Sequence, residues 1–91
     1  MEPEFEWDAA KRSANLAKHG IDFDDIGAAF RDSRATHGLD TREDYGEQRL
    51  AMLATCNTMT LHIVYTLRGM SVRIISARKA NRKERESYER G

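Results

Sequence analysis

Cysteine, proline and long apolar runs are scarce in this sequence. Its 91 residues include one cysteine and one proline. Cys56 therefore has no partner in the chain for a disulfide and no second cysteine at the spacing of a thiolate zinc site. Disulfide frameworks and thiolate zinc domains are both excluded, and we expect Cys56 to be a small buried hydrophobic residue rather than a reactive thiol.

Further absences exclude further classes of protein. No apolar run approaches the roughly 20 residues of a membrane span, and residues 1–8 are acidic where a signal peptide is basic and then apolar. The three histidines lack metal-ligand spacing, and there is neither a glycine-rich phosphate loop nor a serine-nucleophile motif. We expect a cytoplasmic protein with no membrane span, no metal and no cofactor.

The composition fits one folded domain. Hydrophobic residues make up 40% of the chain and charged residues 33%. A chain of this size buries roughly 60–65% of its unfolded surface, which is enough for one hydrophobic core and no more. A single domain over residues 1–91 is predicted.

The net charge of zero conceals a division of charge along the chain. Residues 1–48 hold six basic and twelve acidic side chains, a balance of 6 − 12 = −6, and residues 49–91 hold nine basic and three acidic ones, a balance of 9 − 3 = +6. The two halves either pair with each other or leave a positive surface for phosphate backbones or an acidic protein partner. That surface would include Arg68, Arg73, Arg78, Lys79, Arg82, Lys83 and Arg85.

The N-terminal half predicts a short strand and two helices. Phe5–Trp7 alternates apolar and polar residues, Asp8 is a credible N-cap, and Ala9–His19 is rich in helix formers up to Gly20, a left-handed C′ residue. We place Ala10, Ser13, Ala14, Leu16 and Ala17 on the inward side of this helix, and Lys11, Arg12, Asn15 and Lys18 on the outside.

The second predicted helix begins at Asp22. Ile21 and Ile26 form a hydrophobic staple around this cap. The helix is short, buries Phe23, Ile26 and Phe30, and frays after residue 30.

The C-terminal half predicts three strands and a helix. Residues 36–48 are a polar loop with a weak strand at its start, followed by Arg49–Cys56, Leu61–Leu67 and Val72–Lys79, whose short connections indicate an antiparallel meander. Asn81 and Glu84 form a capping-box pattern for a helix from Arg82 to about Glu89. The predicted fold class is α+β, with two N-terminal helices packed on a small antiparallel sheet and a short C-terminal helix.

Four segments in this order resemble the BrnT toxin family. They are Phe5–Asp8, Asn15–Gly20, Phe23 with the acidic residues after it, and Arg73–Arg85 with its Ser-Ala-Arg strand end. The resemblance implies a RelE-like fold and a metal-independent endoribonuclease that arrests translation. It also implies neutralisation by a BrnA-like antitoxin in a hetero-oligomer, which contacts operator DNA through the antitoxin and represses its own operon.

RNA cleavage by the RNA's own 2′-hydroxyl requires groups that stabilise the negative charge of the transition state. Arginine is suited to this because its fork of donors stays charged and matches phosphate oxygens. The resemblance puts a functional arginine in the Ser-Ala-Arg motif, so Arg78 is the first candidate, Arg68 the second and Arg73 the third. Lys79, Arg82, Lys83 and Arg85 are the candidates for binding the RNA backbone.

Proton transfer requires a titratable group, and the candidates are His19, His37, His62 and Tyr65, of which His19 and Tyr65 are assigned to the catalytic set. His19 also suits the helix C-terminus as a cation, and Tyr65 also suits the core. His37 lies in the polar loop, and His62 is interpreted as a structural histidine. A set of arginines acting without a dedicated base remains an alternative mechanism.

Two alternative functions also remain open. One is a non-catalytic module that binds nucleic acid or protein with the same basic strand and helix. The other is a scaffold that assembles through the acidic half.

Overall fold

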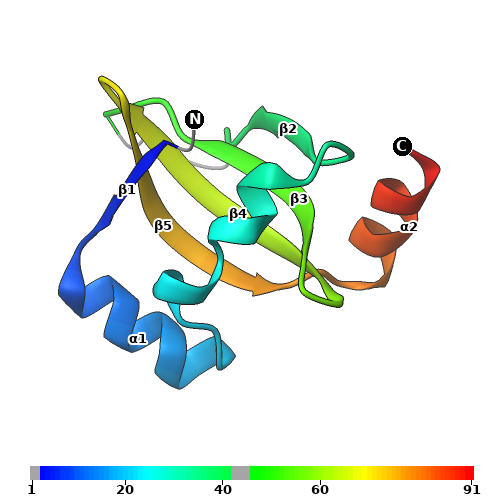
Figure 1. The fold of residues 1–91 in the computed structure, drawn as a ribbon, viewed down its shortest axis with the longest axis horizontal. Helices are drawn as coiled ribbons and strands as arrows, with labels where there is room; N and C mark the ends of the chain where they lie inside the picture. Colours follow the sequence, from blue (N-terminus) through cyan, green and yellow to red (C-terminus); the bar gives the residue numbers. More distant parts are fainter. Residues whose placement is uncertain (1–2, 42–45) are drawn as a thin grey trace.

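A computed structural model describes residues 3–41 and 46–91 and confirms the α+β class (Figure 1). The five-stranded sheet has the order β1-β5-β4-β3-β2. In chain order the elements are β1 (Glu4–Trp7), α1 (Ala9–His19), the 3₁₀ segments η1 (Phe23–Asp25) and η2 (Gly27–Arg31), β2 (Thr36–Leu39), β3 (Leu50–Cys56), β4 (Met59–Arg68), β5 (Ser71–Lys79) and α2 (Arg82–Arg90). The weak strand expected after residue 36 is β2, and part of the predicted loop, residues 42–45, lies outside the described residues.

The sheet is mixed, so the prediction of a purely antiparallel sheet was wrong. Strands β3, β4 and β5 form the predicted antiparallel meander, and β2 adds antiparallel to β3. Strand β1 instead runs parallel to β5, with Phe5 opposite Val72. Parallel neighbours are joined by long crossovers, and no local sequence signal reports a pairing between the first and last strands.

The predicted second helix is in fact two short 3₁₀ segments, of three and five residues. Asp22 caps the first, accepting a hydrogen bond from the Asp24 backbone N–H at 3.1 Å, and the turns meet at Ile26. Phe23, Ile26 and Ala29 are each at most 2% exposed. Their spacing of three residues matches the three-residue period of a 3₁₀ helix, so this winding turns all three toward the core.

Helix α1 has the predicted ends but not the predicted inward side. Asp8 caps it, and Gly20 ends it at φ 71°. All five residues assigned to the inward side are exposed, Leu16 to 46%, whereas Asn15 is only 6% exposed. The Asn15 amide donates to the Ala77 carbonyl at 2.8 Å and accepts from the Ala77 N–H at 3.0 Å. A polar side chain therefore replaces a neighbouring strand at the edge of β5 and holds α1 there.

At the edge of β3, the side chain of Asp32 pairs with a backbone group in the same way. Its carboxylate accepts the Thr55 backbone N–H at 2.8 Å and the Tyr88 hydroxyl at 2.5 Å. These hydrogen bonds, together with the Arg34 N–H at 2.9 Å, lower the pKa of Asp32, the Tyr88 hydroxyl contributing most. Tyr88 is the buried residue of α2, so this carboxylate attaches the C-terminal helix to the sheet.

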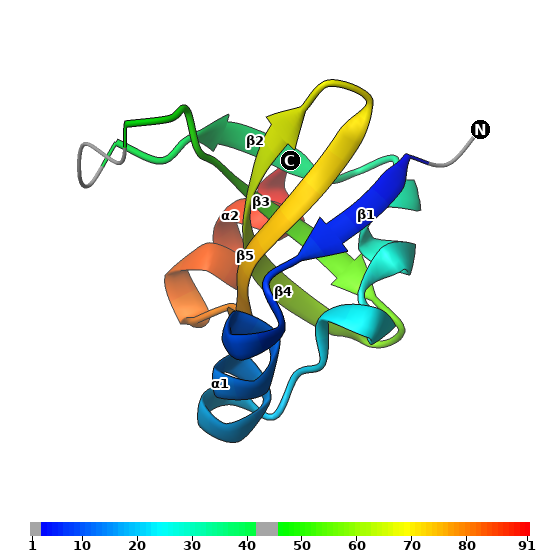
Figure 2. The ribbon, with the colours of Figure 1, turned by 90° about the vertical axis from the view of Figure 1, so that its left-hand side faces the viewer.

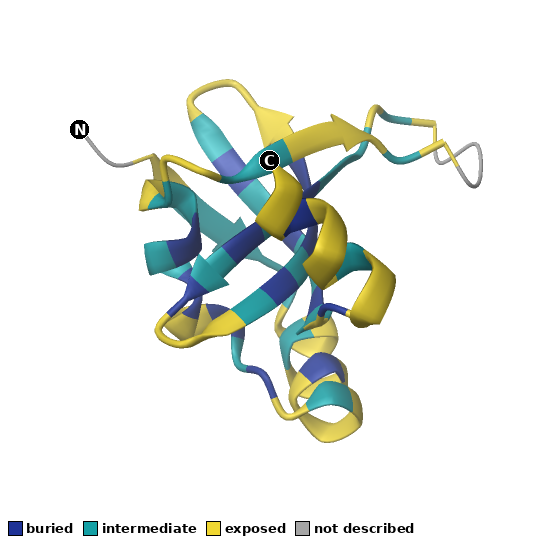
Figure 3. Cartoon of the chain, turned by 90° about the vertical axis from the view of Figure 1, so that its right-hand side faces the viewer, coloured by how far each residue is buried: buried dark blue, intermediate teal, exposed yellow. Residues whose placement is uncertain are grey.

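The two faces of the sheet carry different neighbours. The 3₁₀ segments cover one face and α2 lies against the other (Figure 2). We call these the inner face and the outer face. The inner face forms the core with Phe23, Ile26, Met52, Ile63 and Ile74. Most of α2 on the outer side is exposed (Figure 3).

Candidate functional site

A β-bulge in β5 places the predicted arginines on one face. Val64 pairs with Ser76 and Tyr65 with Ile74, so Ile75 has no partner on β4. Successive side chains of a strand alternate between faces, and an unbroken strand would send Arg73 and Arg78 to opposite sides. The extra residue reverses this alternation, which is what a bulge does.

Arg68, Arg73 and Arg78 consequently share the outer face, where Arg68 and Arg73 both lie near Glu6 and Arg78 lies apart from them. Arg73 lies opposite Thr66 and Arg78 opposite His62, four positions apart on β4. At about 3.3 Å per residue this separates them by roughly 13 Å along the strand. Arg68 lies two positions further away. The three arginines therefore form a row along the outer face, with Arg68 and Arg73 together near Glu6 and Arg78 at the other end.

Each arginine of this row has a carboxylate partner. Arg73 Nη1 lies 3.5 Å from Glu6 Oε1, and Arg68 lies 4.0 Å from the same oxygen and 3.4 Å from Glu47 Oε1. Arg78 makes the tightest pair, with Nη1 and Nη2 donating to the two carboxylate oxygens of Glu84 at 2.8 and 2.9 Å. A bidentate pair of this kind shows that the guanidinium fork of Arg78 is presented in the geometry that recognises an oxyanion.

A cluster of Arg78, Glu84 and His62 forms where β5 meets α2. His62 is the cross-strand neighbour of Arg78, and its Nε2 lies 3.9 Å from Glu84 Oε2. Glu84 also accepts the Asn81 backbone N–H at 2.8 Å, which completes the predicted capping box. The hydrogen bonds from Arg78, above all, lower the pKa of Glu84 from 4.5 to about 2. The cluster unites a fixed cation, a carboxylate and an imidazole within one part of the outer face.

The two catalytic candidates for proton transfer lie on different sides of the sheet. His19 lines an open groove between α1 and β5 together with Ser76, which shares the outer face with Arg78 two positions along the strand. Tyr65 is only 6% exposed on the inner face, and its hydroxyl is 2.9 Å from His37 Nδ1. Burial raises the pKa of Tyr65. The sheet brings His19 toward the arginines and separates Tyr65 from them.

The predicted RNA-binding residues continue the row of arginines. Lys79, Arg82 and Lys83 are exposed around the start of α2, directly after Arg78. Arg82 pairs with Glu86 at 3.2 Å, and Arg85 donates to the Ala80 carbonyl at 3.1 Å. The N-terminal end of α2 is therefore a basic extension of the outer face.

The comparisons with known proteins decide the family. A family model described as the ribonuclease toxin BrnT of type II toxin–antitoxin systems matches residues 7–84, most of the 91-residue chain. The chain belongs to the BrnT family. No curated protein matches the sequence closely enough to add to this. A BrnT toxin is a ribonuclease, so RNA is its substrate and a cognate antitoxin is its partner.

The matched span of this BrnT toxin contains the cluster that sequence reasoning missed. His62 was interpreted as structural and Glu84 only as a helix cap, but both contact the first-choice arginine or its partner. Among residues 3–41 and 46–91, no three His, Cys, Asp or Glu side chains gather as a metal site, and no helix is long and apolar enough to cross a membrane.

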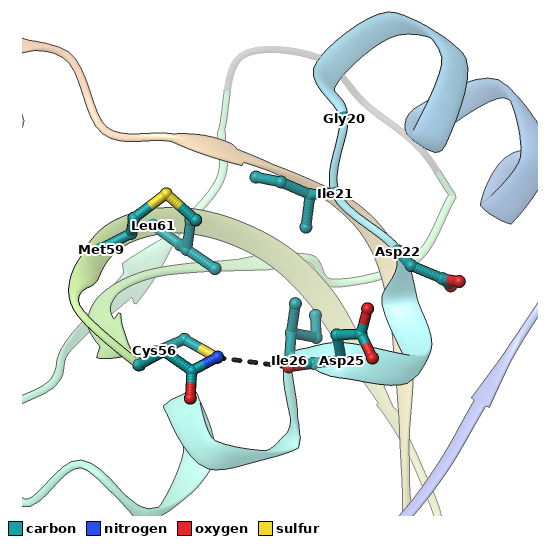
Figure 4. Close-up of a pocket in the computed structure, with 9 residues that line it drawn as sticks. Gly20, Ile21, Asp22, Asp25, Ile26, Cys56, Met59 and Leu61 are labelled. Atoms are coloured by element: carbon teal, nitrogen blue, oxygen red, sulfur yellow. Dashed lines mark hydrogen bonds between the residues drawn. The ribbon is translucent and has the colours of Figure 1, made fainter.

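A separate cavity of about 280 Å³ lies between η1 and the β3–β4 turn of this BrnT toxin (Figure 4). Ile21, Ile26 and Leu61 contribute its apolar walls. Cys56 also lines it, donates its thiol to the Asp25 carbonyl at 3.3 Å and is 3% exposed. The expected burial of Cys56 is confirmed, and this burial raises the pKa of its thiol.

Proposed function

We propose that the outer face of this BrnT toxin cleaves RNA without a metal, using the RNA's own 2′-hydroxyl. The 2′-oxygen attacks the neighbouring phosphorus, its proton passes to a base, and the bond from phosphorus to the 5′-oxygen breaks. The products are a 2′,3′-cyclic phosphate and a 5′-hydroxyl that takes up a proton. The observation that carries this proposal is the bidentate presentation of Arg78 on the outer face.

Arg78 is proposed to stabilise the charge on the phosphate oxygens. Glu84 occupies its guanidinium fork through two carboxylate oxygens, the same arrangement that a phosphate offers, so the scissile phosphate would replace Glu84 there. Arg68 and Arg73, which share Glu6, would hold a neighbouring part of the RNA strand, because they lie too far along the sheet from Arg78 to reach the scissile phosphate. Fixed positive charge of this kind is worth several kcal/mol of barrier.

His62 is proposed as the group that moves the proton, because it lies opposite Arg78 and beside Glu84. His19 remains a candidate at the edge of the outer face. The inner-face position of Tyr65 supports a role in the core for that residue. Lys79, Arg82, Lys83 and Arg85 are proposed to bind the RNA backbone beyond the cleavage point.

The remaining proposals follow from the resemblance to the family. We infer a RelE-like fold and translation arrest in the cytoplasm. We also infer inhibition by a BrnA-like antitoxin, whose complex with the toxin contacts operator DNA through the antitoxin. A non-catalytic module that binds nucleic acid or protein is the alternative, and the row of basic residues is compatible with it.

Cleavage of RNA by the purified chain, with and without EDTA, tests the proposal. Replacing Arg78 with Ala should lower the cleavage rate by on the order of 10²–10³-fold, and EDTA should leave the wild-type rate unchanged. Arg90→Ala is the matched control, because Arg90 is an exposed arginine at the far end of α2. Loss of activity in EDTA would contradict metal independence. RNA binding without cleavage by the wild type would favour the binding module.

A further inference from the structure

A groove of about 290 Å³ runs between α1 and β5 at the edge of the outer face. Lys11 and Lys18 line it from the helix side, and Ile75 and Ser76 line it from the strand side. The two lysines are seven residues apart, two helical turns, so both point to the same side of α1. The sequence interpretation had treated them only as part of a solvated helix surface.

The groove is positively charged and held in shape. None of the described residues that line it is acidic. Asn15 fixes α1 against β5 through both backbone groups of Ala77, so the two walls cannot separate without breaking buried hydrogen bonds. The lysine ammonium groups, the Ser76 hydroxyl and the His19 ring are all groups that can donate a hydrogen bond to an oxyanion.

The groove is continuous with the arginine row. Ser76 and Arg78 share the outer face and are two residues apart on β5, about 6.6 Å along the strand. A strand of RNA with one phosphate at Arg78 therefore passes the mouth of this groove with its next phosphates.

We propose that the groove is a phosphate subsite in which Lys11 and Lys18 bind the RNA backbone beside the scissile phosphate. The proposal rests on the proposed function, which puts the scissile phosphate at Arg78. It extends the RNA-binding surface from α2 across β5 to α1, so the RNA strand contacts both helices. Its ligand is a phosphodiester of single-stranded RNA.

Binding of a 2′-O-methyl oligoribonucleotide at several salt concentrations tests the subsite. This probe cannot be cut, because its 2′-oxygen carries no proton and is blocked as a nucleophile. The double variant Lys11→Gln with Lys18→Gln should bind on the order of tenfold more weakly. Each lost phosphate contact should also reduce the slope of log K against log salt by about 0.7, or about 1.4 for both.

Two controls keep the result specific. Lys11→Arg with Lys18→Arg preserves both charges and should retain the wild-type slope, while Arg90→Gln removes one charge at the far end of α2 and should change it little. A double glutamine variant with the same slope as Arg90→Gln would overturn the subsite. Unmodified RNA is tested for cleavage in parallel, and a wild type that binds the probe but cleaves nothing would overturn the proposed function while leaving the subsite in place.

Discussion

The two faces of the sheet separate the residues that hold the fold together from those that we propose act on RNA. On the inner face, the rings of Phe30 and Tyr65 pack edge to face, with their centroids 5.4 Å apart, among side chains that are almost fully buried. On the outer face, Arg68, Arg73 and Arg78 pair with carboxylates while remaining 53%, 25% and 33% exposed. Exposed ion pairs contribute little to stability, so the outer face can exchange its carboxylates for phosphates at small cost to the fold.

The extra residue in β5 maintains this separation by turning Ala77 inward and Arg78 outward, and an arginine placed at position 77 is the strongest way to break the comparison. Ala77 is fully buried on the inner face, opposite Ile63. Burying an unpaired arginine in the core costs more than a small domain can compensate. We expect the Ala77→Arg variant to be unfolded by circular dichroism and to lose cooperative thermal melting.

Ser76→Arg is the control, because Ser76 is the neighbouring residue of β5 but faces the outer side, where it is partly exposed. It should fold cooperatively. An Ala77→Arg variant with a native spectrum and a sharp melting transition would show that position 77 does not face the core, and the argument for a shared arginine face would lose its basis.

The bulge also explains why the cluster at Arg78 escaped sequence reasoning. Local signals predicted both ends of α1 and the capping box at Asn81 and Glu84 because these depend on residues a few positions apart. Counting back from the pair Arg68–Ser71, however, places His62 opposite Ala77, and only the one-residue shift brings it opposite Arg78. The row of basic residues was visible in the sequence, while its partners depended on this register.

Contacts between distant segments account for the other errors. The pairing of β1 with β5 joins the two ends of the chain. The inward side of α1 was misassigned because helical periodicity favoured its small residues, whereas the edge of β5 required the hydrogen-bonding groups of Asn15. Polar residues that satisfy strand edges give no apolar periodicity, so the sequence pattern does not report them.

Replacing Asn15 with Ala should produce the next largest effect, again on the fold rather than on RNA. It leaves the Ala77 N–H and carbonyl and the Ile21 carbonyl without their side-chain partner in a buried position. Unsatisfied buried groups cost about 1–3 kcal/mol each when water cannot reach them, so we expect a loss of roughly 2–4 kcal/mol in the free energy of unfolding. The midpoint of urea denaturation measures it.

The neighbouring change Ala17→Ser serves as the control, since Ala17 is exposed on the same helix. It should change the free energy of unfolding by no more than about 0.5 kcal/mol. An Asn15→Ala protein within about 1 kcal/mol of the wild type would mean that α1 is held at β5 by its other contacts.

The smallest expected effect is on the outer face and depends on pH. Arg78 holds the pKa of Glu84 at about 2, below its usual 4.5, so the folded state favours the carboxylate. This stability is fully present above about pH 4.5 and is lost as the pH falls toward 2, with a magnitude of about 1 kcal/mol, because solvent screens a partly exposed pair. Asp22 and Asp32 also have lowered pKa values and lose stability at low pH, so the difference between the wild type and Glu84→Gln isolates Glu84. The free energies of unfolding of the two proteins, measured from pH 7 to pH 2, should converge toward the acidic end. Curves that stay parallel down to pH 2 would show that the ionised carboxylate of Glu84 adds no stability to the fold.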